Sequence, residues 1–420
     1  MGRLVDRHIT QTLNEAMADT RVVLVNGARQ CGKSTLVAQV AARRGTAWFS
    51  LDRADSLSAA RRDPTGFVRA ANPMVIDEVQ RAPELLLAIK EVVDAEFQPG
   101  RFLLTGSARV LGLRSLPDTL PGRMETIELW PLSQGEIDQQ PDGFVESVFN
   151  SGADVSHHSD LDRADYVARL VRGGFPEAVA RSGRRRERFF ESYVADLVNR
   201  DVMQLSTIEH GRELRQLITL LAGRVGQIIN TSNLASSLGL PRRTVERYLA
   251  LLEEVFLIKR LPAWSGGSTG RVTRAPKLAF VDSGVAAMLM GHNSSSLEQI
   301  TSPVGGVLES FVAMEVARQL TWASQTIELS HYRTRDQIEV DIVLQNRRGQ
   351  IVALEVKAAA TAANSDFRGL RHLQSHLGDR LLAGIVLYLG NQTLPFGQRL
   401  RAMPLSALWQ CEAPSNSPVD

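Results

Sequence analysis

The segment GARQCGKST at residues 27–35 places two glycines, a lysine and two hydroxyl residues at the spacing of the phosphate-binding pattern G-x-x-x-x-G-K-[ST]. It lies between the apolar run RVVLV and the helical pattern STLVAQVAAR, which predicts a buried strand, a glycine turn and a helix. Backbone N–H groups of such a turn point at phosphate oxygens, and the helix N-terminus adds positive potential. We expect Lys33 to reach the β and γ phosphates, Ser34 to bind Mg²⁺, and Thr35 to help hold the phosphates. The predicted nucleotide-binding segment is the whole loop, namely Gly27, Ala28, Arg29, Gln30, Cys31, Gly32, Lys33, Ser34 and Thr35.

Two further apolar runs end in residues that suit the same site. The run MVID ends in Asp77, which is expected to orient Mg²⁺ through water, and the next residue, Glu78, is placed to polarise the attacking water. The run RFLLTGSAR ends near Ser107, whose hydroxyl is expected either to contact the γ phosphate or to cap a helix. Strands that alternate with helices predict a parallel sheet that binds its ligand at the carboxyl ends of the strands. The sequence therefore predicts an ATP or GTP site.

A second group of acidic residues lies in the last third of the chain. Asp341 ends the alternating run QIEVD, and after the turn signal NRRGQ the residues Glu355 and Lys357 project from one face of the next strand. The amphipathic helix GGVLESFVAMEVARQL carries Glu309. Carboxylates in this arrangement can gather Mg²⁺ ions beside a phosphodiester, and Lys357 can steady the attacking water or the developing charge.

This acid, acid-x-lysine pattern resembles the PD-(D/E)xK nucleases of the restriction-endonuclease-like fold. The leading proline of that signature is absent, because the residues that end in Asp341 read EVD. The resemblance implies the fold and a metal site formed by Glu309, Asp341 and Glu355. The alternative is an inherited fold whose acidic residues only pair with Lys357 or with nearby arginines. The pattern leaves both interpretations open.

The middle of the chain has the layout of a winged helix. A helical pattern is followed by TSNLASSLG, a turn at LP, the amphipathic segment RRTVERYLALLEE and the strand-like FLIKRL. In a DNA-binding version the second of these helices enters the major groove. The residues near its N-terminal end that are expected to contact bases or phosphates are Arg242, Arg243, Thr244 and Arg247. Winged helices also pack against proteins, so DNA contact and protein contact are both retained as predictions.

Four segments together resemble one prokaryotic AAA-type ATPase family. They are GARQCGKST, VIDEVQRAPELL, LLTGSAR and LPGRMETIELWPLSQGE, and in that family the ATPase domain is followed by a C-terminal domain of unknown function. The resemblance implies adenine nucleotide and ATP hydrolysis, and it matches Lys33, Asp77 and Glu78 to the usual roles. It also matches Arg123 in LPGR to a recurring arginine, which either contacts phosphate or pins the loop to the sheet. Arg200 and Asp201 in LVNRDV match a recurring Arg-Asp pair. Arg200 either acts as an arginine finger or forms a buried salt bridge between helices.

Composition limits the class of protein. The 420 residues are 44% apolar and 22% charged, which is ordinary for a chain with two or three globular domains. Two cysteines, Cys31 and Cys411, cannot supply a disulfide framework or a zinc site. The N-terminus lacks the apolar core of a signal peptide and no run is long enough to span a membrane, so we expect a cytoplasmic location. The net charge of +2 does not by itself indicate a nucleic-acid binder, although RSGRRRER is a local basic cluster.

We therefore expect an α/β protein with several domains. The predicted divisions are an AAA-type P-loop ATPase domain at 1–137, a linker and helical connector at 138–211, a winged helix at 212–270, a nuclease-like domain at 271–412 and a polar tail at 413–420. The expected function is a Mg²⁺-dependent ATPase that acts as a switch for a C-terminal DNA- or partner-binding module. The alternative is an ATP-regulated, metal-dependent nuclease. AAA-type machinery often works between subunits, so a homo-oligomer is compatible with this prediction.

Overall fold

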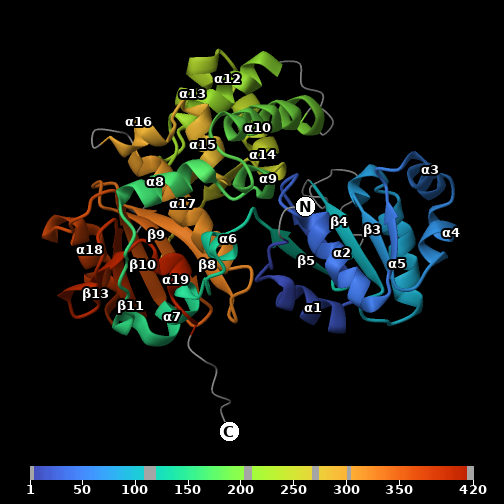
Figure 1. Ribbon diagram of the computed structural model, residues 1–420, viewed down its shortest axis with the longest axis horizontal. Helices are drawn as coiled ribbons and strands as arrows, with labels where there is room; N and C mark the ends of the chain where they lie inside the picture. Colours follow the sequence, from blue (N-terminus) through green and yellow to red (C-terminus); the bar gives the residue numbers. More distant parts are fainter. Residues whose placement is uncertain (1–3, 108–119, 203–210, 267–273, 300–303, 414–420) are drawn as a thin grey trace, which may run out of the picture. The chain divides into compact units, whose positions relative to one another are not determined.

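A computed structural model describes residues 4–107, 120–202, 211–266, 274–299 and 304–413, with the side chains of 200–202 left out. The chain forms two compact units (Figure 1). The first consists of Met1–Leu132, Asn199–Thr207 and Glu254–Phe256. The second consists of Ser133–Val198, Ile208–Glu253 and Leu257–Asp420.

The first unit is built on a five-stranded sheet in the order β2-β3-β4-β1-β5. Its strands are β1 (Val22–Gly27), β2 (Ala47–Ser50), β3 (Met74–Asp77), β4 (Phe102–Gly106) and β5 (Met124–Leu129). All neighbouring strands are parallel, which confirms the predicted parallel sheet. The strands β1, β3 and β4 are buried along their whole length, as expected where helices cover both faces of a parallel sheet.

The helices of the first unit connect and cover these strands. They are α1 (Thr10–Asp19), α2 (Lys33–Arg44), α3 (Ala54–Arg62), α4 (Pro64–Arg69), the short η1 (Val79–Arg81) and α5 (Leu85–Ala95). Residues of α3, α4 and α5 pack against the sheet face that carries Leu24, Ile76 and Leu104. The helix that follows the phosphate loop, α2, contacts β1, β3 and β4 and lies in front of the strands in Figure 1.

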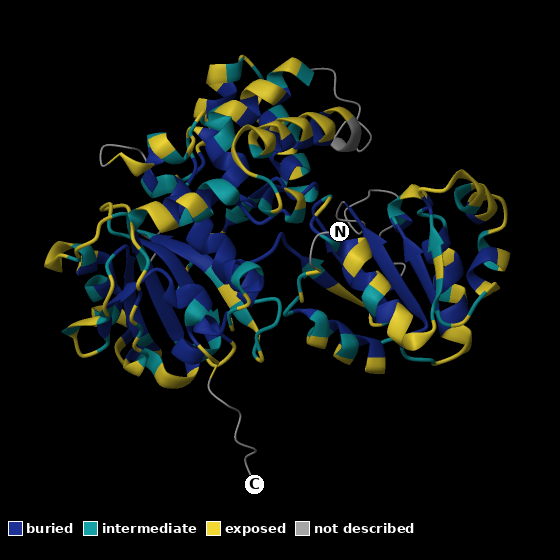
Figure 2. Cartoon of the chain, in the orientation of Figure 1, coloured by how far each residue is buried: buried dark blue, intermediate teal, exposed yellow. Residues whose placement is uncertain are grey.

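The second unit contains a six-stranded sheet in the order β12-β13-β11-β10-β9-β8. Its strands are β8 (Ile327–Arg333), β9 (Glu339–Asn346), β10 (Ile351–Lys357), β11 (Leu381–Tyr388), β12 (Leu394–Gly397) and β13 (Leu400–Pro404). The first three pair antiparallel, whereas β10 with β11 and β11 with β13 are parallel. The central strands are buried, as their dark blue colour in Figure 2 shows.

Two long helices accompany this sheet. The helix α18 (Arg368–Leu377) packs Leu370 and Leu373 against the face that carries Ala353 and Val386. The helix α17 (Val304–Gln319) is buried on nearly all sides, which explains why its sequence is apolar around most of the helix. Shorter elements complete this part of the unit, namely η5 (Asn364–Phe367), η6 (Gly378–Arg380) and α19 (Ala407–Gln410).

The first part of the predicted linker and connector at 138–211 contains a buried helix. This helix is α7 (Phe144–Ser151), followed by η3 (Gly152–Asp154). The backbone N–H of Val145 donates to Gln319 Oε1 at 3.0 Å, and the N–H of His157 donates to Thr393 Oγ1 at 2.8 Å. The apolar residues of FVESVF are buried and decide the structure, although polar residues surround them in sequence.

A helical group and a hairpin make up the rest of the second unit. The helices are α6 (Gln134–Asp138), α8 (Arg163–Arg172), α9 (Pro176–Val179), α10 (Gly183–Asp196), α12 (Gly211–Ala222), α13 (Thr231–Leu238), α15 (Ser283–Leu289) and α16 (Ser294–Glu298). Two further helices begin in the second unit and end in residues assigned to the first, namely η4 (Leu197–Val202) and α14 (Arg242–Glu254). The strands β6 (Ile258–Leu261) and β7 (Lys277–Phe280) pair antiparallel. Within the described ranges, no helix has the length and apolar character needed to cross a membrane.

Candidate functional site

The phosphate loop follows β1 directly, and its two glycines are required for different reasons. Gly32, the residue before α2, has a φ of 102°, which disfavours any residue with a Cβ. Gly27 lies against β5, where a Cβ would be only 2.1 Å from the backbone oxygen of Leu129. Gly32 of the phosphate-binding pattern is therefore required by its backbone conformation, and Gly27 by the close approach of β5.

Lys33 is buried and is directed back toward the loop. Its Nζ donates to the carbonyl oxygens of Gly27 at 3.0 Å and Ala28 at 2.8 Å. A lysine ammonium carries three N–H groups, so a donor remains for a phosphate oxygen after these two bonds. The amine is therefore held beside the loop at the start of α2.

Arg7, in the N-terminal segment, also holds the phosphate loop in place. No sequence pattern indicated this residue. The guanidinium of Arg7 donates to the carbonyl oxygens of Cys31 at 3.0 Å and Trp130 at 2.7 Å. The thiol of Cys31 is buried and donates to Leu129 O at 3.3 Å. These bonds join the loop to the end of β5.

Asp77, at the end of β3, connects three segments through its carboxylate. Its Oδ1 accepts hydrogen bonds from Ser34 Oγ at 3.0 Å and Thr105 Oγ1 at 2.6 Å, and its Oδ2 accepts from Ser50 Oγ at 3.3 Å. The loop hydroxyl and the acidic strand that the sequence assigned to Mg²⁺ are therefore adjacent. Hydroxyl and carboxylate oxygens are the ligands that Mg²⁺ prefers, so these residues fit this ion.

Glu78 and Ser107 are linked by a glutamine that the sequence patterns did not single out. Gln80 Nε2 donates to Glu78 Oε2 and, at 2.9 Å, to Ser107 Oγ. Glu78 itself adopts the left-handed conformation with φ 60° and ψ 47°, and its N–H donates to Thr105 Oγ1 at 3.0 Å. The two residues predicted to act at the γ phosphate thus belong to one hydrogen-bonded group.

The structure does not bring Arg123 to the loop of its own chain. Its guanidinium pairs with Asp94 and donates to Pro121 O at 3.0 Å, and its carbonyl oxygen accepts from the N–H of Val22, the first residue of β1. The phosphate loop follows the other end of β1, roughly 16 Å away at the rise of an extended strand. Within one subunit Arg123 therefore stabilises the amino end of the sheet.

The remaining loop residues differ in exposure. Ala28 is buried, Arg29 is half-buried, and Gln30, Ser34 and Thr35 are exposed. Arg200 lies in η4, and its side chain lies outside the described part of the chain.

The acidic residues of the second unit surround a lysine that no sequence pattern indicated. Lys277, at the start of β7, lies with its Nζ 2.6 Å from Asp341 Oδ1, 2.8 Å from Glu309 Oε2 and 3.3 Å from Glu339 Oε1. Asp341 Oδ2 accepts from the N–H of Val356 at 2.9 Å. The structure thus brings Glu309 and Asp341 together, as the sequence predicted, but around an internal cation.

Glu355 and Lys357 lie on the strand beside Asp341. The ladder between β9 and β10 ends with Leu354 opposite Ile342, so Asp341 and Glu355 are the next residues along the two strands. Lys357 Nζ donates to Glu355 Oε1 at 2.8 Å, and Glu355 Oε2 is buried without a hydrogen-bond partner among the described residues. This salt bridge corresponds to the structural alternative left open by the sequence.

Burial and neighbouring charge alter the pKa values of this cluster. Burial raises the pKa of Glu309 to about 7 and that of Glu355 to about 8, and the negative charge of Asp341 adds to both shifts. Burial alone would lower the pKa of Lys277, but the carboxylates of Asp341, Glu309 and Glu339 outweigh it and raise the pKa above its ordinary value. Lys277 therefore stays protonated at neutral pH, whereas the pKa values of Glu309 and Glu355 lie close to neutral pH.

This arrangement does not fit a divalent metal ion. Among the residues that the structure describes, no group of three or more His, Cys, Asp or Glu side chains is placed to hold one. Lys277 already provides the positive charge at the point where the carboxylates converge.

Most of the first unit matches a known protein family. Residues 19–138, which include the phosphate loop and the Asp77 and Glu78 strand, match the family described as AAA domain. The first unit carries an AAA-type ATPase domain. ATP binding and hydrolysis are the activities of this domain. Two further matches carry no function, the domain of unknown function DUF8612 at residues 163–296 and the domain of unknown function DUF4143 at residues 304–408.

Curated relatives cover most of the chain. An uncharacterized protein of Mycobacterium tuberculosis is 28% identical over 413 residues, which are 95% of this chain and 83% of that protein. An uncharacterized protein of Haemophilus influenzae is 23% identical over 287 residues, which are 67% of this chain and 65% of that protein. Among solved structures, a Walker-type ATPase of Pyrococcus abyssi is 13% identical and covers 68% of this chain and 96% of its own, with a TM-score of 0.43. A score this low adds nothing to the assignment of the AAA domain.

The helix α14 presents basic residues on its exposed side. Val245, Tyr248 and Leu249 are buried, which leaves Arg243 and Arg247 on the outer face one turn apart. Arg242 forms an exposed salt bridge with Glu246 at 2.8 Å, and Thr244 is half-buried. Of the predicted DNA-contacting residues, Arg243 and Arg247 are therefore the best placed.

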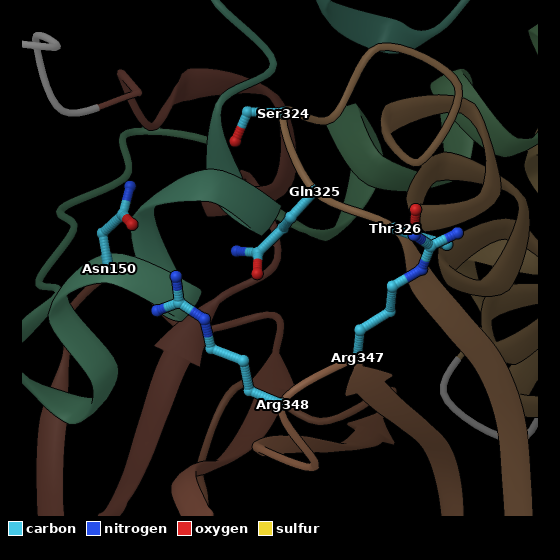
Figure 3. A pocket seen from close by; sticks show the side chains of 6 residues that line it. All are labelled: Asn150, Ser324, Gln325, Thr326, Arg347 and Arg348. Carbon is cyan, nitrogen blue, oxygen red and sulfur yellow. The ribbon is translucent and has the colours of Figure 1, made fainter.

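A polar hollow of about 500 Å³ lies at the turn between β9 and β10. Figure 3 shows Arg348 directed toward Asn150 and Arg347 toward Thr326, with Gln325 between them. Arg347 is six residues beyond Asp341 along an extended strand, so about 20 Å separates this hollow from the acidic cluster. The hollow and the cluster are distinct features of the second unit.

We predict that Gln80→Ala lowers the turnover number of ATP hydrolysis by roughly tenfold while the KM for ATP changes little. The reason is that Gln80 holds the Glu78 carboxylate and the Ser107 hydroxyl but makes no bond to the phosphate loop. Steady-state kinetics with Mg²⁺ separates the two parameters. Gln98→Ala, the same change at a residue that bonds Asn72, serves as the control. A wild-type turnover number in Gln80→Ala would refute this positioning role.

Proposed function

We propose that the chain is a Mg²⁺-dependent ATP-hydrolysing switch that controls a DNA- or partner-binding module in its second unit, without cutting nucleic acid. The observation that carries the catalytic part is the convergence of Lys33, Ser34, Asp77 and Glu78 at the carboxyl ends of β1 and β3. Such a convergence is what hydrolysis of a bound triphosphate requires.

Each residue has a defined role in this proposal. The loop N–H groups and Lys33 bind the β and γ phosphates, and Ser34 and Asp77 hold Mg²⁺, which neutralises charge on the phosphate oxygens when bound. Glu78 accepts a proton from the attacking water, and Gln80 fixes the direction of its carboxylate. Ser107, bonded to the same glutamine, is positioned to respond to the γ phosphate.

Chain connectivity supports the switch. Glu253 belongs to the second unit, whereas Glu254, the last residue of α14, belongs to the first. In this proposal, a change in the first unit on ATP hydrolysis reaches the helix that carries Arg243 and Arg247 through this point of the chain. The switch is a proposal that this continuity favours.

The second unit has the elements that we propose as a winged helix. The order α12, α13, α14 and β6 matches the layout expected from the sequence, and β7, which lies beyond the predicted boundary at 270, is added to it in this proposal. The segment between α12 and α13 also pairs with β7, because the N–H of Gly226 donates to Leu278 O and the N–H of Leu278 donates to Gln227 O, both at 2.9 Å. This adds a third extended segment to the hairpin and supports the proposed fold.

The restriction-endonuclease-like fold is likewise a proposal for the rest of the unit. The helix α17 precedes three antiparallel strands, and α18 then crosses to β11, which runs parallel to β10. The acidic positions lie on α17, β9 and β10, as the resemblance implies. A metal-dependent nuclease is therefore the alternative function, and the salt bridges of Lys277 and Lys357 weigh against it.

The ATPase prediction is tested with two substitutions. Lys33→Ala removes the phosphate-binding amine and should weaken ATP binding and hydrolysis together. Glu78→Gln keeps the shape but loses the proton acceptor, so turnover should fall by about a hundredfold or more while ATP still binds. Turnover is measured by phosphate release with Mg²⁺, and binding by a fluorescent ATP analogue. Glu91→Gln, on the exposed side of α5, is the control, and unchanged turnover in Glu78→Gln would reject Glu78 as the base.

The DNA prediction concerns Arg243 and Arg247. If these residues contact phosphates, affinity falls steeply with salt, and each change to Ala should reduce the slope of log K against log [salt] by about one. Arg242→Ala should change the slope less, because Glu246 already neutralises that guanidinium. Fluorescence anisotropy with duplex DNA at several salt concentrations gives the slopes. A flat salt dependence would instead favour a protein partner for this helix.

The absence of cleavage is the third prediction of this proposal. Linear, nicked and single-stranded DNA, and RNA, should remain intact with Mg²⁺ or Mn²⁺, with or without ATP, because the carboxylates already bond to lysines. Gel analysis of end-labelled substrates provides the measurement. Cleavage by the wild type that disappears in Asp341→Ala would establish the nuclease alternative.

A further inference from the structure

Lys277 is placed in the acidic cluster by the backbone of the hairpin. It is paired in register with Leu261 of β6 on one side and forms a β-bridge with Ile228 on the other. Its side chain leaves this three-segment group and reaches α17 and β9, where it is 3% exposed. The position of the ammonium is therefore determined by strand pairing on both sides of the residue.

We propose that Lys277 is the resident cation of this cluster and that it takes the place of a divalent metal, so that the wild-type site binds none. Its salt bridges would hold the β6–β7 hairpin against α17 and β9. This inference rests on the part of the proposed function in which the second unit does not cut nucleic acid. It does not depend on ATP hydrolysis.

The hydrogen-bonding capacity of the ammonium matches its surroundings. A lysine has three donors, and three carboxylates lie within reach, those of Asp341, Glu309 and Glu339. The second oxygen of Asp341 accepts from the N–H of Val356. Asp341 thus accepts a hydrogen bond on each carboxylate oxygen, from Lys277 on Oδ1 and from Val356 on Oδ2.

A metal ion bound to Asp341 would conflict with this arrangement. Protein oxygens bind Mg²⁺ at about 2.0–2.1 Å, which would place the ion close to the ammonium that lies 2.6 Å from the same carboxylate. Two cations at that separation repel strongly where burial excludes water. Arg333 adds a further cation, with its NH1 3.4 Å from Glu339 Oε2.

Removal of the Lys277 charge should change the metal affinity of the cluster. In Lys277→Met the side chain keeps its length and apolar stem but loses its charge, so three carboxylates converge without a cation. Such a group is costly to bury. The carboxylates are not placed for a metal ion in the wild type, but without the ammonium between them they can close around a divalent ion, which then supplies the missing positive charge. The substitution should therefore create the metal site that the wild type lacks.

The experiment measures Mn²⁺ binding to the full-length, nucleotide-free protein by electron paramagnetic resonance and by thermal unfolding with and without Mn²⁺. Wild type and Asp341→Asn should bind the same amount of Mn²⁺. Lys277→Met should bind it at least about tenfold more tightly than wild type, with a rise in Tm on adding Mn²⁺, and Lys277→Met/Asp341→Asn should lose both effects. Lys357→Met is the matched control, because it removes the other lysine near the cluster and should gain no site.

Two results would overturn the inference. One is a wild-type protein that binds a Mn²⁺ ion which Asp341→Asn loses, and this comparison holds even if Lys277→Met does not fold. The other is a folded Lys277→Met protein with unchanged Mn²⁺ affinity and Tm. ATP hydrolysis is followed on the same samples, so that a failed ATPase proposal is recognised separately from a failed metal comparison.

Discussion

The parallel register of β1, β3 and β4 is the constraint on which the ATPase site depends. Pairing of Val25 with Thr105 and of Ile76 with Leu104 brings the next residue of β3, Asp77, alongside Thr105. Since all these strands end at the same edge, the loop after β1 meets the acidic end of β3 there. A slip of one residue would turn the carboxylate to the opposite face of the sheet and separate it from Ser34.

The residues of this site that follow one another at short spacing in the sequence could be predicted. Lys33, Ser34, Asp77 and Glu78 stand in short motifs, and each motif follows an apolar strand, so both residue type and position could be predicted. Other contributors have no such pattern, because they are defined only by partners far along the chain. Gln80 and Ser107 are 27 residues apart, and Arg7 and Trp130 are 123 apart. Arg123 shows the reverse problem, since its motif is recognisable but the direction of β5 carries it to the far end of the sheet.

The second unit was predictable to a similar degree and for similar reasons. Alternating apolar residues located β9 and β10. Helical periodicity located α12, α13 and α14, whereas β7 lies beyond the predicted boundary at 270. Lys277 could not be found this way, because it is an ordinary basic residue at the start of a short strand and its carboxylate partner Asp341 lies 64 residues later. A pattern of acids alone therefore suggested a metal centre, whereas the charge that balances them comes from another element. In the same way, composition concealed α7, whose few apolar residues are enough to bury it.

The left-handed backbone of Glu78 has a consequence for how this domain can change. A non-glycine residue in that conformation costs about 1–2 kcal/mol, so the fold gives up stability to aim one carboxylate. Glycine would relieve the strain but remove the acid, and a β-branched residue would increase it. Selection for a more stable ATPase domain and selection for turnover therefore act in opposite directions at this position. Where nucleotide binding without hydrolysis is enough, glycine at this position would make the domain more stable.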